Sequence, residues 1–456
     1  MNNVSDSASG RFHDRADVDR CAAMIHAAHG AGWIDDQTSS VIMHDLGRMR
    51  ARLAMLHAAF PDNALHALAV KANPVVEVLR EAVACGVGLE AASMEEVYLA
   101  LAADCPPERI VFDSPAKTSA EIGEAVRRGI LINANSFNEL QRIDAELLAQ
   151  PTTSKIGLRI NPDVGSGTIA HTSVANQASK FGVALDAHRQ RIVHAFQRYR
   201  WLSGLHVHVG SQGCSLEMLV EAVAKANALR QEIESSTLRA LDFMDIGGGL
   251  PAVYRSEDRS PAPKEYADRL KAVVNDLFDD GPRIVTEFGR CVQAGCGLTF
   301  SRVEYVQRDS STAIIHVGAD LLLRPVYASN DWKHEYFVLD EHFQPKTANV
   351  ECWNLAGPLC FSGDVIGRNV SLPRIAPGDW IVIRDTGAYT LSMWSRHCSR
   401  SIPLVLGYDA DAAEPFRLLR AAESPAYLAA FWSSDPTAVP SDNRAGGSVD
   451  CSSRQE

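Results

Sequence analysis

The feature that most constrains the fold is an alternation of short apolar segments with amphipathic segments between about residues 41 and 300. The apolar segments are candidate strands, and they span 66–72, 109–115, 129–136, 155–162, 202–210, 243–249 and 283–289. Segments between them, such as 74–86 and 217–235, have the apolar spacing of helices. Repeated strand–helix units predict a parallel sheet, and a closed (β/α)8 TIM barrel is the leading form. A doubly wound sheet is the alternative, but no GxGxxG follows the first strand.

The pattern changes after about residue 300. From there to about residue 417, strands are separated by turns rich in Pro, Gly and Asp, which predicts an all-β domain. We therefore expect a barrel over residues 41–300 and a Greek-key-like β-domain over 301–432. Residues 1–40 are expected to be partly disordered and partly joined to the β-domain. The polar tail 433–456 is expected to be disordered.

Composition limits the classes of function. A chain of 456 residues suggests two domains, and 46% hydrophobic with 22% charged residues is ordinary for a globular protein. The net charge of −12 gives no support for nucleic-acid binding. No apolar run approaches the roughly 20 residues that span a membrane, and the polar N-terminus lacks a secretory signal, so we expect a cytoplasmic protein without a membrane partner. The ten cysteines include no CxxC pair, so neither a metal site nor a disulfide framework is expected.

Polar residues gather at the ends of the candidate strands, which is where barrels of this kind carry their chemistry. Lys71 follows an apolar run, where a buried cation is costly unless it is paired or used. A lysine that reaches back to water is the ordinary alternative. His206 and His208 alternate along one strand and therefore share a face. Asp245 precedes three glycines, and Glu287 ends the next strand.

Together these features indicate a cofactor that carries a phosphate and links to a lysine. Successive glycines at 247–249 let backbone N–H groups approach an anion closely. The buried lysine and the strand-end glutamate supply the other groups that such a cofactor needs. Each feature alone also fits a plain loop or a structural side chain. As a set, they are typical of a site for pyridoxal 5'-phosphate (PLP).

Six motifs, in register over about residues 40–410, carry a resemblance to a known family. They are AVKAN, HVHVGSQ, DIGGG, EFGR, GPLCFSGD and GAYTLSM. The sequence resembles the PLP-dependent decarboxylases of the alanine-racemase-like fold, the group that holds diaminopimelate, ornithine and arginine decarboxylases. The EFGR motif departs from the family's EPGR because Phe288 stands where proline is usual. The resemblance implies an amino-acid decarboxylase whose substrate is a small molecule.

The resemblance also implies a role for each motif residue. Lys71 would link covalently to the cofactor, and burial would lower its pKa and make the amine nucleophilic. His208 would stack on the pyridine ring, while Glu287 would bind the ring nitrogen and keep it protonated. Ser211, Gly248, Gly249, Arg290 and Tyr389 would hold the phosphate, and the other implied cofactor contacts are Glu90, Arg159 and Gly289. Glu90 stands where the family often has Asp.

A head-to-tail homodimer with shared active sites is a further implication of the resemblance. Cys360 and Asp364 would each act in the active site of the other subunit. Cys360 would return a proton to the reacting carbon. The ordinary alternative for this cysteine is an inert buried side chain.

The substrate-binding residues implied by the family are Arg290, Arg324, Tyr327, Cys360, Phe361 and Asp364. Arg324 and Tyr327 fall where diaminopimelate decarboxylases bind a distal carboxylate, which the fork of an arginine can bind bidentately. Phe361 stands where the family has Glu or Asp facing an amine of the substrate. Without that carboxylate, a substrate ammonium would lack its counter-ion in a desolvated pocket. Trp332, Trp353 and Trp394 are expected to be core residues, and the alternative is that they line a larger pocket.

These residues predict a substrate with a distal acid and no distal amine. The leading hypothesis is a decarboxylase of an amino-acid–citrate conjugate, of the citryl-diaminopropionate type, in carboxylate-siderophore biosynthesis. The alternative is meso-diaminopimelate decarboxylase of lysine biosynthesis. A racemase of the same fold is less favoured, because the cysteine motif and the long β-domain match decarboxylases. A binding protein that has lost catalysis is disfavoured because both Lys71 and Cys360 are present.

Overall fold

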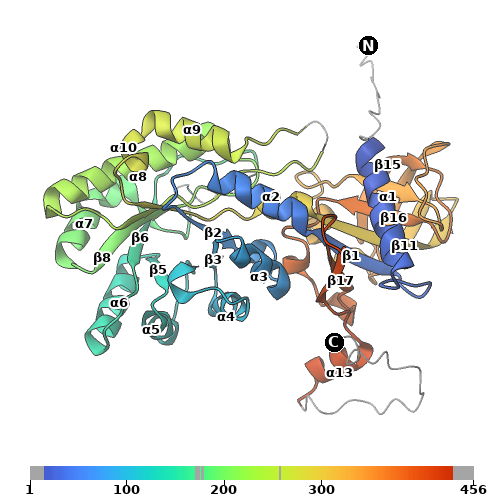
Figure 1. Ribbon diagram of the computed structural model, residues 1–456, viewed down its shortest axis with the longest axis horizontal. Coiled ribbons are helices and arrows are strands. Elements are labelled where there is room, and N and C mark those ends of the chain that lie inside the picture. Colours follow the sequence, from blue (N-terminus) through green and yellow to red (C-terminus); the bar gives the residue numbers. More distant parts are fainter. Residues whose placement is uncertain (1–14, 170–174, 176–178, 256–257, 435–456) are drawn as a thin grey trace.

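The computed structural model describes residues 15–169, 175, 179–255 and 258–434. These residues form a barrel and a separate, mostly-β sheet domain, which lie side by side along the long axis of the molecule (Figure 1). The expectation of disorder concerned part of residues 1–40 and the tail 433–456, and it falls largely outside the described residues, which exclude 1–14 and 435–456.

The barrel has eight parallel strands and is closed. In spatial order they are β2 (Leu65–Ala69), β3 (Gly88–Ala91), β4 (Ile110–Phe112), β5 (Leu131–Ala134), β6 (Ile156–Asn161), β8 (Leu202–Val207), β9 (Phe243–Asp245) and β10 (Arg283–Thr286). The pairs β5–β6 and β10–β2 close the ring, while the short β7 (Val183–Ala184) pairs only with β6. The predicted barrel is therefore confirmed, and the doubly wound alternative is wrong.

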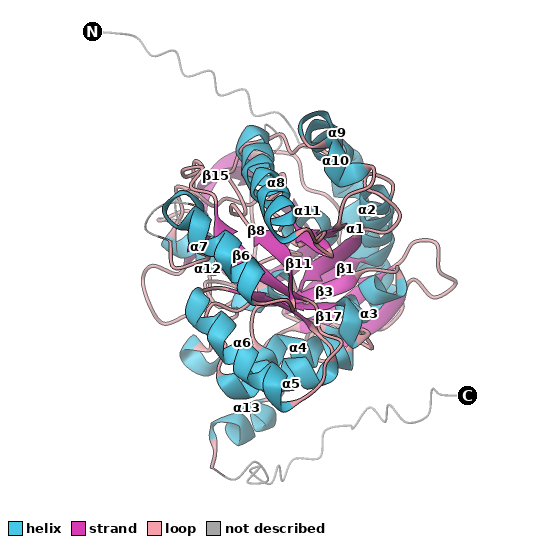
Figure 2. Ribbon diagram, turned by 90° about the vertical axis from the view of Figure 1, so that its left-hand side faces the viewer, coloured by secondary structure: helices cyan, strands magenta, loops and turns pink. Residues whose placement is uncertain are grey.

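Helices surround these strands, as Figure 2 shows from one end of the barrel. They are α2 (Leu46–His57), α3 (Val76–Ala84), α4 (Met94–Ala102), α5 (Ser119–Arg128), α6 (Phe137–Ala149), α7 (Leu185–Arg198), α8 (Leu216–Thr237), α9 (Pro263–Val273) and α10 (Asn275–Phe278). Several begin just after a strand at a Ser or Thr whose side chain accepts a hydrogen bond from the third helical N–H. Thr118 and Glu121 form a complete capping box of this kind at α5. Such caps keep the strand-to-helix loops short and fix the strand ends.

One barrel strand, β3, was not among the candidate strands. Its sequence is Gly-Leu-Glu-Ala, in which Glu90 leaves no run of apolar residues longer than one. All four residues are buried, and Glu90 faces the barrel mouth at the carboxyl end of the strand. The break in the apolar pattern is therefore the point at which the strand carries a site residue.

The β-domain is built on a nine-stranded sheet. Its strands are β1 (Ser40–Asp45), β11 (Gly297–Gln307), β12 (Thr312–Ile315), β13 (Tyr336–Leu339), β14 (Val350–Ala356), β15 (Val365–Pro373), β16 (Trp380–Arg384), β17 (Leu404–Tyr408) and β18 (Phe416–Arg420). The first of them, β1, comes from the start of the chain and pairs with β11 and β17. Helix α1 (Arg15–Gly30) packs on the same sheet, where Met24 and Ile25 are buried beside Trp380.

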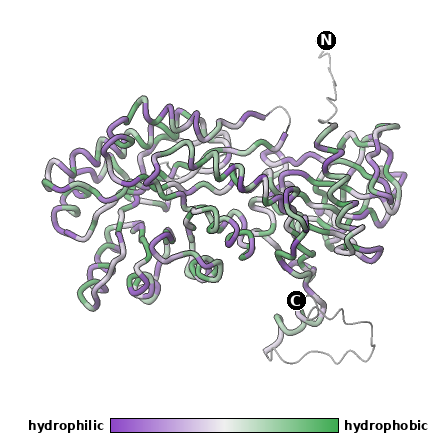
Figure 3. The backbone as a smooth tube through the Cα atoms, viewed as in Figure 1, coloured by the Kyte–Doolittle hydropathy of each residue, from purple (hydrophilic) through white to green (hydrophobic). Residues whose placement is uncertain are grey.

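Short helices connect the barrel to the β-domain or lie at the end of the chain. They are α11 (Arg290–Gln293), α12 (Leu323–Tyr327) and α13 (Pro425–Trp432). Hydrophobic stretches run through both parts of the molecule, with hydrophilic segments between them (Figure 3). Among the described residues, no helix combines the length and the apolar character that crossing a membrane requires.

A small apolar cluster fills the barrel at the end where the strands begin. Phe243 lies at its centre, with Leu65, Val111 and Leu131 around it. Gly204, on the neighbouring strand, is in direct contact with the ring, because a Cβ at this position would lie 2.2 Å from Phe243 Cε1. The ring therefore occupies the volume that a side chain at residue 204 would need.

This contact gives the first prediction. Gly204→Ala should lower the free energy of unfolding by roughly 1–3 kcal/mol, because the new methyl overpacks the interior. Adding Phe243→Leu should recover part of that loss by making room, as measured by urea unfolding. Gly30→Ala is the matched control, since nothing lies within 4 Å of a Cβ there. Equal stability of Gly204→Ala and the unchanged protein would contradict this packing.

Candidate active site

Lys71 lies directly after β2, in the one-turn 3-10 helix η1 (Val70–Ala72). Its Nζ donates a hydrogen bond to Oε2 of Glu90 on the neighbouring strand β3. The side chain of Glu90 is fully buried, whereas that of Lys71 keeps 35% of its surface accessible. The amine is therefore held by a buried carboxylate while the site stays open on the side of Lys71.

The structure corrects one expectation about Lys71. Burial lowers the pKa of the amine, as the sequence predicted, but the carboxylates of Glu90 and Glu287 outweigh burial and hold that pKa above its ordinary value. The Lys71 ammonium in turn favours the ionised form of Glu90, against the effect of burial. The prediction of a lowered lysine pKa is therefore wrong for the free amine, which is held as an ammonium by two buried acids.

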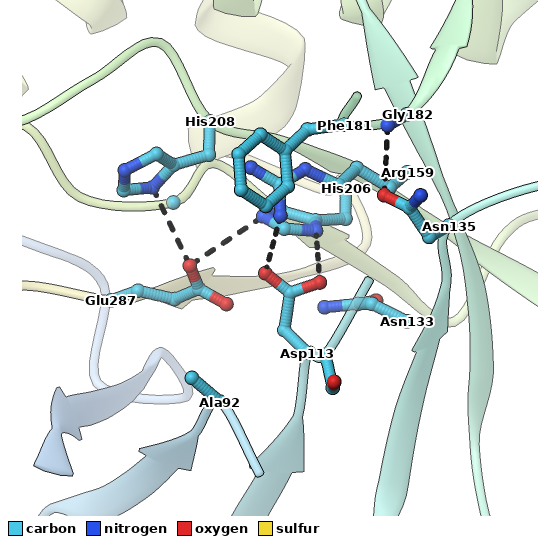
Figure 4. A network of polar contacts seen from close by, with 12 residues as sticks. Ala92, Asp113, Asn133, Asn135, Arg159, Phe181, Gly182, His206, His208 and Glu287 are labelled. Carbon is cyan, nitrogen blue, oxygen red and sulfur yellow. Dashed lines mark hydrogen bonds and ion pairs between the residues drawn. The ribbon is translucent and has the colours of Figure 1, made fainter. Parts of the chain in front are cut away.

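The carboxylate of Glu287 lies next to the rings of two histidines, His206 and His208 (Figure 4). It follows β10, and its side chain is 1% exposed. Its Oε2 lies 3.5 Å from Nε2 of His206 and 3.5 Å from Nδ1 of His208. Burial favours a raised pKa, but His206 and Lys71 outweigh it and hold the pKa of Glu287 well below its ordinary value. Glu287 is therefore a buried anion.

A second carboxylate, Asp113, faces His206 from the other side (Figure 4). Its Oδ2 lies 2.8 Å from Nη1 of Arg159, and its Oδ1 lies 3.6 Å from Nδ1 of His206. Burial lowers the pKa of His206, but Asp113 and Glu287 outweigh burial and raise it to about 9. His206 is therefore an imidazolium between two carboxylates at neutral pH. The predicted cofactor residue Arg159 has Asp113 as its ion-pair partner.

His208 is the neutral member of the histidine pair. The backbone N–H of Gly248 donates to its Nδ1 at 3.1 Å, which places the ring proton on Nε2. Burial lowers the pKa of His208, although Glu287 opposes this effect. A neutral, half-buried imidazole beside the barrel mouth has the properties of a ring that packs against an aromatic cofactor.

Asp245 ends β9 and is also buried, but its environment differs. Burial and the nearby charge of Glu287 raise its pKa well above the ordinary value, which favours the protonated acid. Its Oδ1 accepts from Gly247 N–H at 2.9 Å, and its Oδ2 lies 2.9 Å from the amide nitrogen of Asn133. The Asn133 amide oxygen has no partner among the described residues. Turning that amide by 180° would let its oxygen accept the Asp245 proton.

The glycine loop after β9 requires glycine at each of its three positions. Gly247 and Gly249 have φ of +66° and +122°, which side-chain-bearing residues rarely adopt. At Gly248, a Cβ would lie 2.4 Å from the carbonyl oxygen of Glu287. The N–H of Gly248 donates a hydrogen bond to His208, an interaction that the sequence did not predict. The phosphate-binding role of Gly248 and Gly249 stays a prediction.

Arg290 begins α11, immediately after Glu287, Phe288 and Gly289. Its Nε donates to Oγ of Ser211 at 2.9 Å, and its Nη1 donates to the hydroxyl of Tyr254 at 2.7 Å. Its Nη2 is buried without a partner among the described residues. The structure thus brings together Ser211 and Arg290, two of the predicted phosphate-binding residues, and adds Tyr254.

Gly289 and Tyr389 pack against the turn that carries Lys71. A Cβ at Gly289 would lie 2.9 Å from Cβ of Ala72, so a larger residue would displace the lysine turn. The backbone N–H of Tyr389 donates to the carbonyl oxygen of Ala72 at 2.9 Å. Both predicted cofactor residues therefore border the lysine.

The cysteine loop forms a separate group. Cys360 is exposed, and its N–H donates to Sγ of Cys398 at 3.4 Å. Asp364 is buried, and its two oxygens accept from the N–H groups of Ala319 and Leu359 at 2.7 Å each. In the described part of the chain, no hydrogen bond or ring contact of Cys360, Phe361 or Asp364 reaches Lys71, Glu287 or Arg290.

Arg324 and Tyr327, the two residues predicted to bind a distal carboxylate of the substrate, lie in different places: one near Lys71 and the other at the cysteine loop. Tyr327 is 69% exposed and stacks on Phe361, with ring centroids 6.0 Å apart. Arg324 lies on the same short helix, α12, but its guanidinium carbon lies 4.8 Å from the centroid of the Tyr389 ring. Arg324 therefore belongs to the Lys71 side, whereas Tyr327 belongs to the cysteine loop.

The residues present fit PLP. The buried oxygens of Glu287 lack hydrogen-bond partners among the described residues at normal distance, as do Nη2 of Arg290 and Nη1 of Arg324. An anionic carboxylate, a lysine amine and guanidinium groups with free donors match the ring nitrogen, the aldehyde and the phosphate of this cofactor. Ligand atoms of His206, His208 and Glu287, or of Glu90, Asp113 and Glu287, also lie within 4.8 Å of one another, as metal ligands do, but these groups belong to the same site.

Comparisons with known proteins agree with this site. The pyridoxal-binding domain of pyridoxal-dependent decarboxylases matches residues 46–294. The diaminopimelate decarboxylase of Aquifex aeolicus is 32% identical over 362 residues, which cover 77% of this chain and 82% of that protein. The same-named protein of Bacteroides thetaiotaomicron is 30% identical over 366 residues, which cover 78% and 90%.

The crystal structure of Helicobacter pylori diaminopimelate decarboxylase complexed with L-lysine is 26% identical, with a TM-score of 0.77 over 86% of this chain and 96% of that one. The chain belongs to the pyridoxal-dependent decarboxylases. It is accordingly a PLP-dependent carboxy-lyase that acts on an amino acid. The predicted family, fold, cofactor and type of enzyme are confirmed.

Some residues of the decarboxylase site were missed by sequence reasoning. Asp113 lies within the candidate segment 109–115 and directly follows β4, and this position at a strand end was the signal that could have identified it. Trp332 was expected to be core, but it stacks on the guanidinium groups of Arg290 and Arg324. Tyr254 lies in a loop after the glycines and offered no signal of its own.

The charge states of the decarboxylase give the second prediction. Asp245→Asn should change the free energy of unfolding by less than about 1 kcal/mol, because an amide resembles the protonated acid. Asp113→Asn should cost about 3–5 kcal/mol, because Arg159 and His206 lose their counter-charge. Urea unfolding of the two matched variants at pH 7.5 measures both values. A loss at Asp245→Asn as large as that at Asp113→Asn would show that Asp245 is ionised.

Proposed function

We propose that the decarboxylase removes the α-carboxylate of an amino acid whose far end carries a second carboxylate, and that meso-diaminopimelate is the substrate. The observation that carries this proposal is Arg324. It is a half-buried guanidinium with one buried nitrogen unpartnered and with no ion pair to a described carboxylate. The names of the relatives support diaminopimelate as the amino acid.

Each residue of the site has a part in this reaction. PLP, when bound, supplies an electron sink for the electrons of the bond to the departing carboxylate. Lys71 would hold the cofactor covalently, and the anionic Glu287 would keep a proton on the ring nitrogen. His208 would pack on the ring as a neutral imidazole. Arg290 and Ser211 would hold the phosphate.

A head-to-tail homodimer is part of the proposal. The cysteine loop makes no bond to the Lys71 group in the described part of its own chain, so its residues are available to the other subunit. Cys360 is exposed, as a residue that donates a proton in the partner's site must be before assembly. Asp364 would hold this loop in shape through its two backbone hydrogen bonds.

Phe361 favours a second candidate substrate, an amino-acid–citrate conjugate from siderophore assembly. Its ring stacks on Tyr327 and lies 5.8 Å from the ring of His397, centroid to centroid. This apolar group offers no charge to an ammonium at the far end of a substrate. The names of the relatives support diaminopimelate and give the conjugate no support.

The test of the proposed function is carbon dioxide release by the PLP-loaded protein. We expect turnover of meso-diaminopimelate at a kcat/KM at least about tenfold above those of lysine and ornithine, which lack the distal carboxylate. Arg324→Leu should remove this preference. Lys71→Ala should be inactive with every substrate.

The same assay includes the citryl-diaminopropionate conjugate and the variant Phe361→Glu. Efficient turnover of the conjugate with none of diaminopimelate would overturn the proposal in favour of the second candidate. Under the proposal, Phe361→Glu should raise kcat/KM for diaminopimelate, because a carboxylate then faces its second amine. Equal rates on lysine and diaminopimelate would exclude both candidates.

A further inference from the structure

Two guanidinium groups share one aromatic box where the barrel meets the β-domain. Arg290 comes from the end of the barrel, and Arg324 comes from α12. The Trp332 ring centroid lies 4.7 Å from the guanidinium carbon of Arg290 and 4.5 Å from that of Arg324. For the Tyr389 ring, the same distances are 4.2 and 4.8 Å. Each arginine therefore contacts the same two rings.

Tyr254 completes the box and fixes the indole. Its ring meets that of Trp332 edge to face, with centroids 6.0 Å apart, and its hydroxyl accepts a hydrogen bond from Arg290. Trp332 is 7% exposed, and its backbone N–H donates to the carbonyl oxygen of Ala328 at 3.0 Å. The indole therefore has little freedom to move away from the two guanidinium groups.

The box holds positive charge without an internal counter-ion. Neither Arg290 nor Arg324 forms an ion pair with a carboxylate of the described residues. Burial and the neighbouring charge of Arg290 lower the pKa of Arg324 to about 10. Electron-rich ring faces reduce the cost of bringing the two cations together, and the effect is strongest where water is excluded. Two bound anions from outside the chain would neutralise the charges of Arg290 and Arg324.

We propose that Trp332 is a positioning residue that holds Arg290 for the cofactor phosphate and Arg324 for a carboxylate of the substrate. For the phosphate, the inference rests on the family's cofactor. For the carboxylate, it rests on the proposed function. Trp332 itself touches neither anion and acts through the orientation of the two guanidinium groups.

Trp332 and Tyr389 differ in the contacts that they make outside the box. Tyr389 adjoins the Lys71 turn through its backbone N–H, and its side chain also acts on the charge of Lys71, so changing it also disturbs the lysine. Trp332 has no such link, and its ring is shared between the arginines and Tyr254. A role limited to core packing would require only volume at this position, whereas the proposed role requires an aromatic face.

The experiment measures the affinity of the protein for PLP and for pyridoxal, which lacks the phosphate, by equilibrium dialysis. Trp332→Leu should weaken PLP binding about tenfold while leaving pyridoxal binding unchanged, because two cation–π contacts are lost at a desolvated site. Trp332→Phe should retain most of the PLP affinity. If Trp332→Leu does not fold, Trp332→Met replaces it, since a flexible thioether fills irregular gaps.

Trp353→Leu is the matched control. Its indole is also buried and lies over a guanidinium, that of Arg308, at 5.4 Å, but in the β-domain away from the box. This variant should lower the melting temperature without changing either affinity. Equal weakening of PLP and pyridoxal by Trp332→Leu would show a structural role only. Unchanged PLP binding would overturn the inference as well.

Steady-state kinetics of the PLP-saturated variants test whether Trp332 positions Arg324 for the substrate carboxylate. With the substrate that is turned over fastest, Trp332→Leu should raise KM several-fold and change kcat little. A loss confined to kcat would contradict the positioning of Arg324. If none of the offered amino acids is turned over, the proposed function fails, while the PLP and pyridoxal affinities still decide the role of Trp332 toward Arg290.

Discussion

The site depends on a balance of buried charges at the carboxyl ends of the barrel strands. Four buried acids meet there: Glu90, Asp113, Asp245 and Glu287. An isolated buried carboxylate is costly, so each must be paired or neutralised. Three are offset by cations, namely Lys71, Arg159 and His206. For the fourth, Asp245, burial and the charge of Glu287 raise the pKa and favour the neutral acid. Glu287 remains an anion, as a residue that is proposed to bind the cofactor ring nitrogen must be.

The backbone around these charges is built to let a cofactor approach. Two glycines with positive φ turn the chain after β9, and Gly289 brings the next strand end against the lysine turn. A second, purely cationic group lies where the barrel meets the β-domain, with Arg290 and Arg324 between aromatic rings. In the proposed arrangement, the carboxylates would serve the ring end of PLP, and the arginines would serve its phosphate and the far end of the substrate. This separation of charge would orient both molecules before any reaction.

Much of this could be predicted from the sequence, because strand-end residues show directly in the chain. The strand pattern predicted seven of the eight barrel strands, and only β3 was missed, where Glu90 breaks the apolar run. Charge states were less accessible, since they depend on residues far apart in the chain. Lys71 was expected to have a lowered pKa, but Glu90, 19 residues away, reverses the shift. Trp332 was predicted to be a core residue for the same reason. The guanidinium groups that it contacts, those of Arg290 and Arg324, come together only in the folded protein.

The most direct test of this charge balance is the titration of His206 in the PLP-loaded protein. Histidine labelled with 13C would be followed by NMR from pH 5.5 to 10, with His206→Asn used to assign the signal. Burial alone would lower this pKa, but Asp113 and Glu287 raise it to about 9, so the ring should stay an imidazolium through neutral pH. In Asp113→Asn the titration should move to lower pH. A neutral His206 ring at pH 7 would contradict the account, because Glu287 and Asp113 would then lack the charge that keeps both ionised.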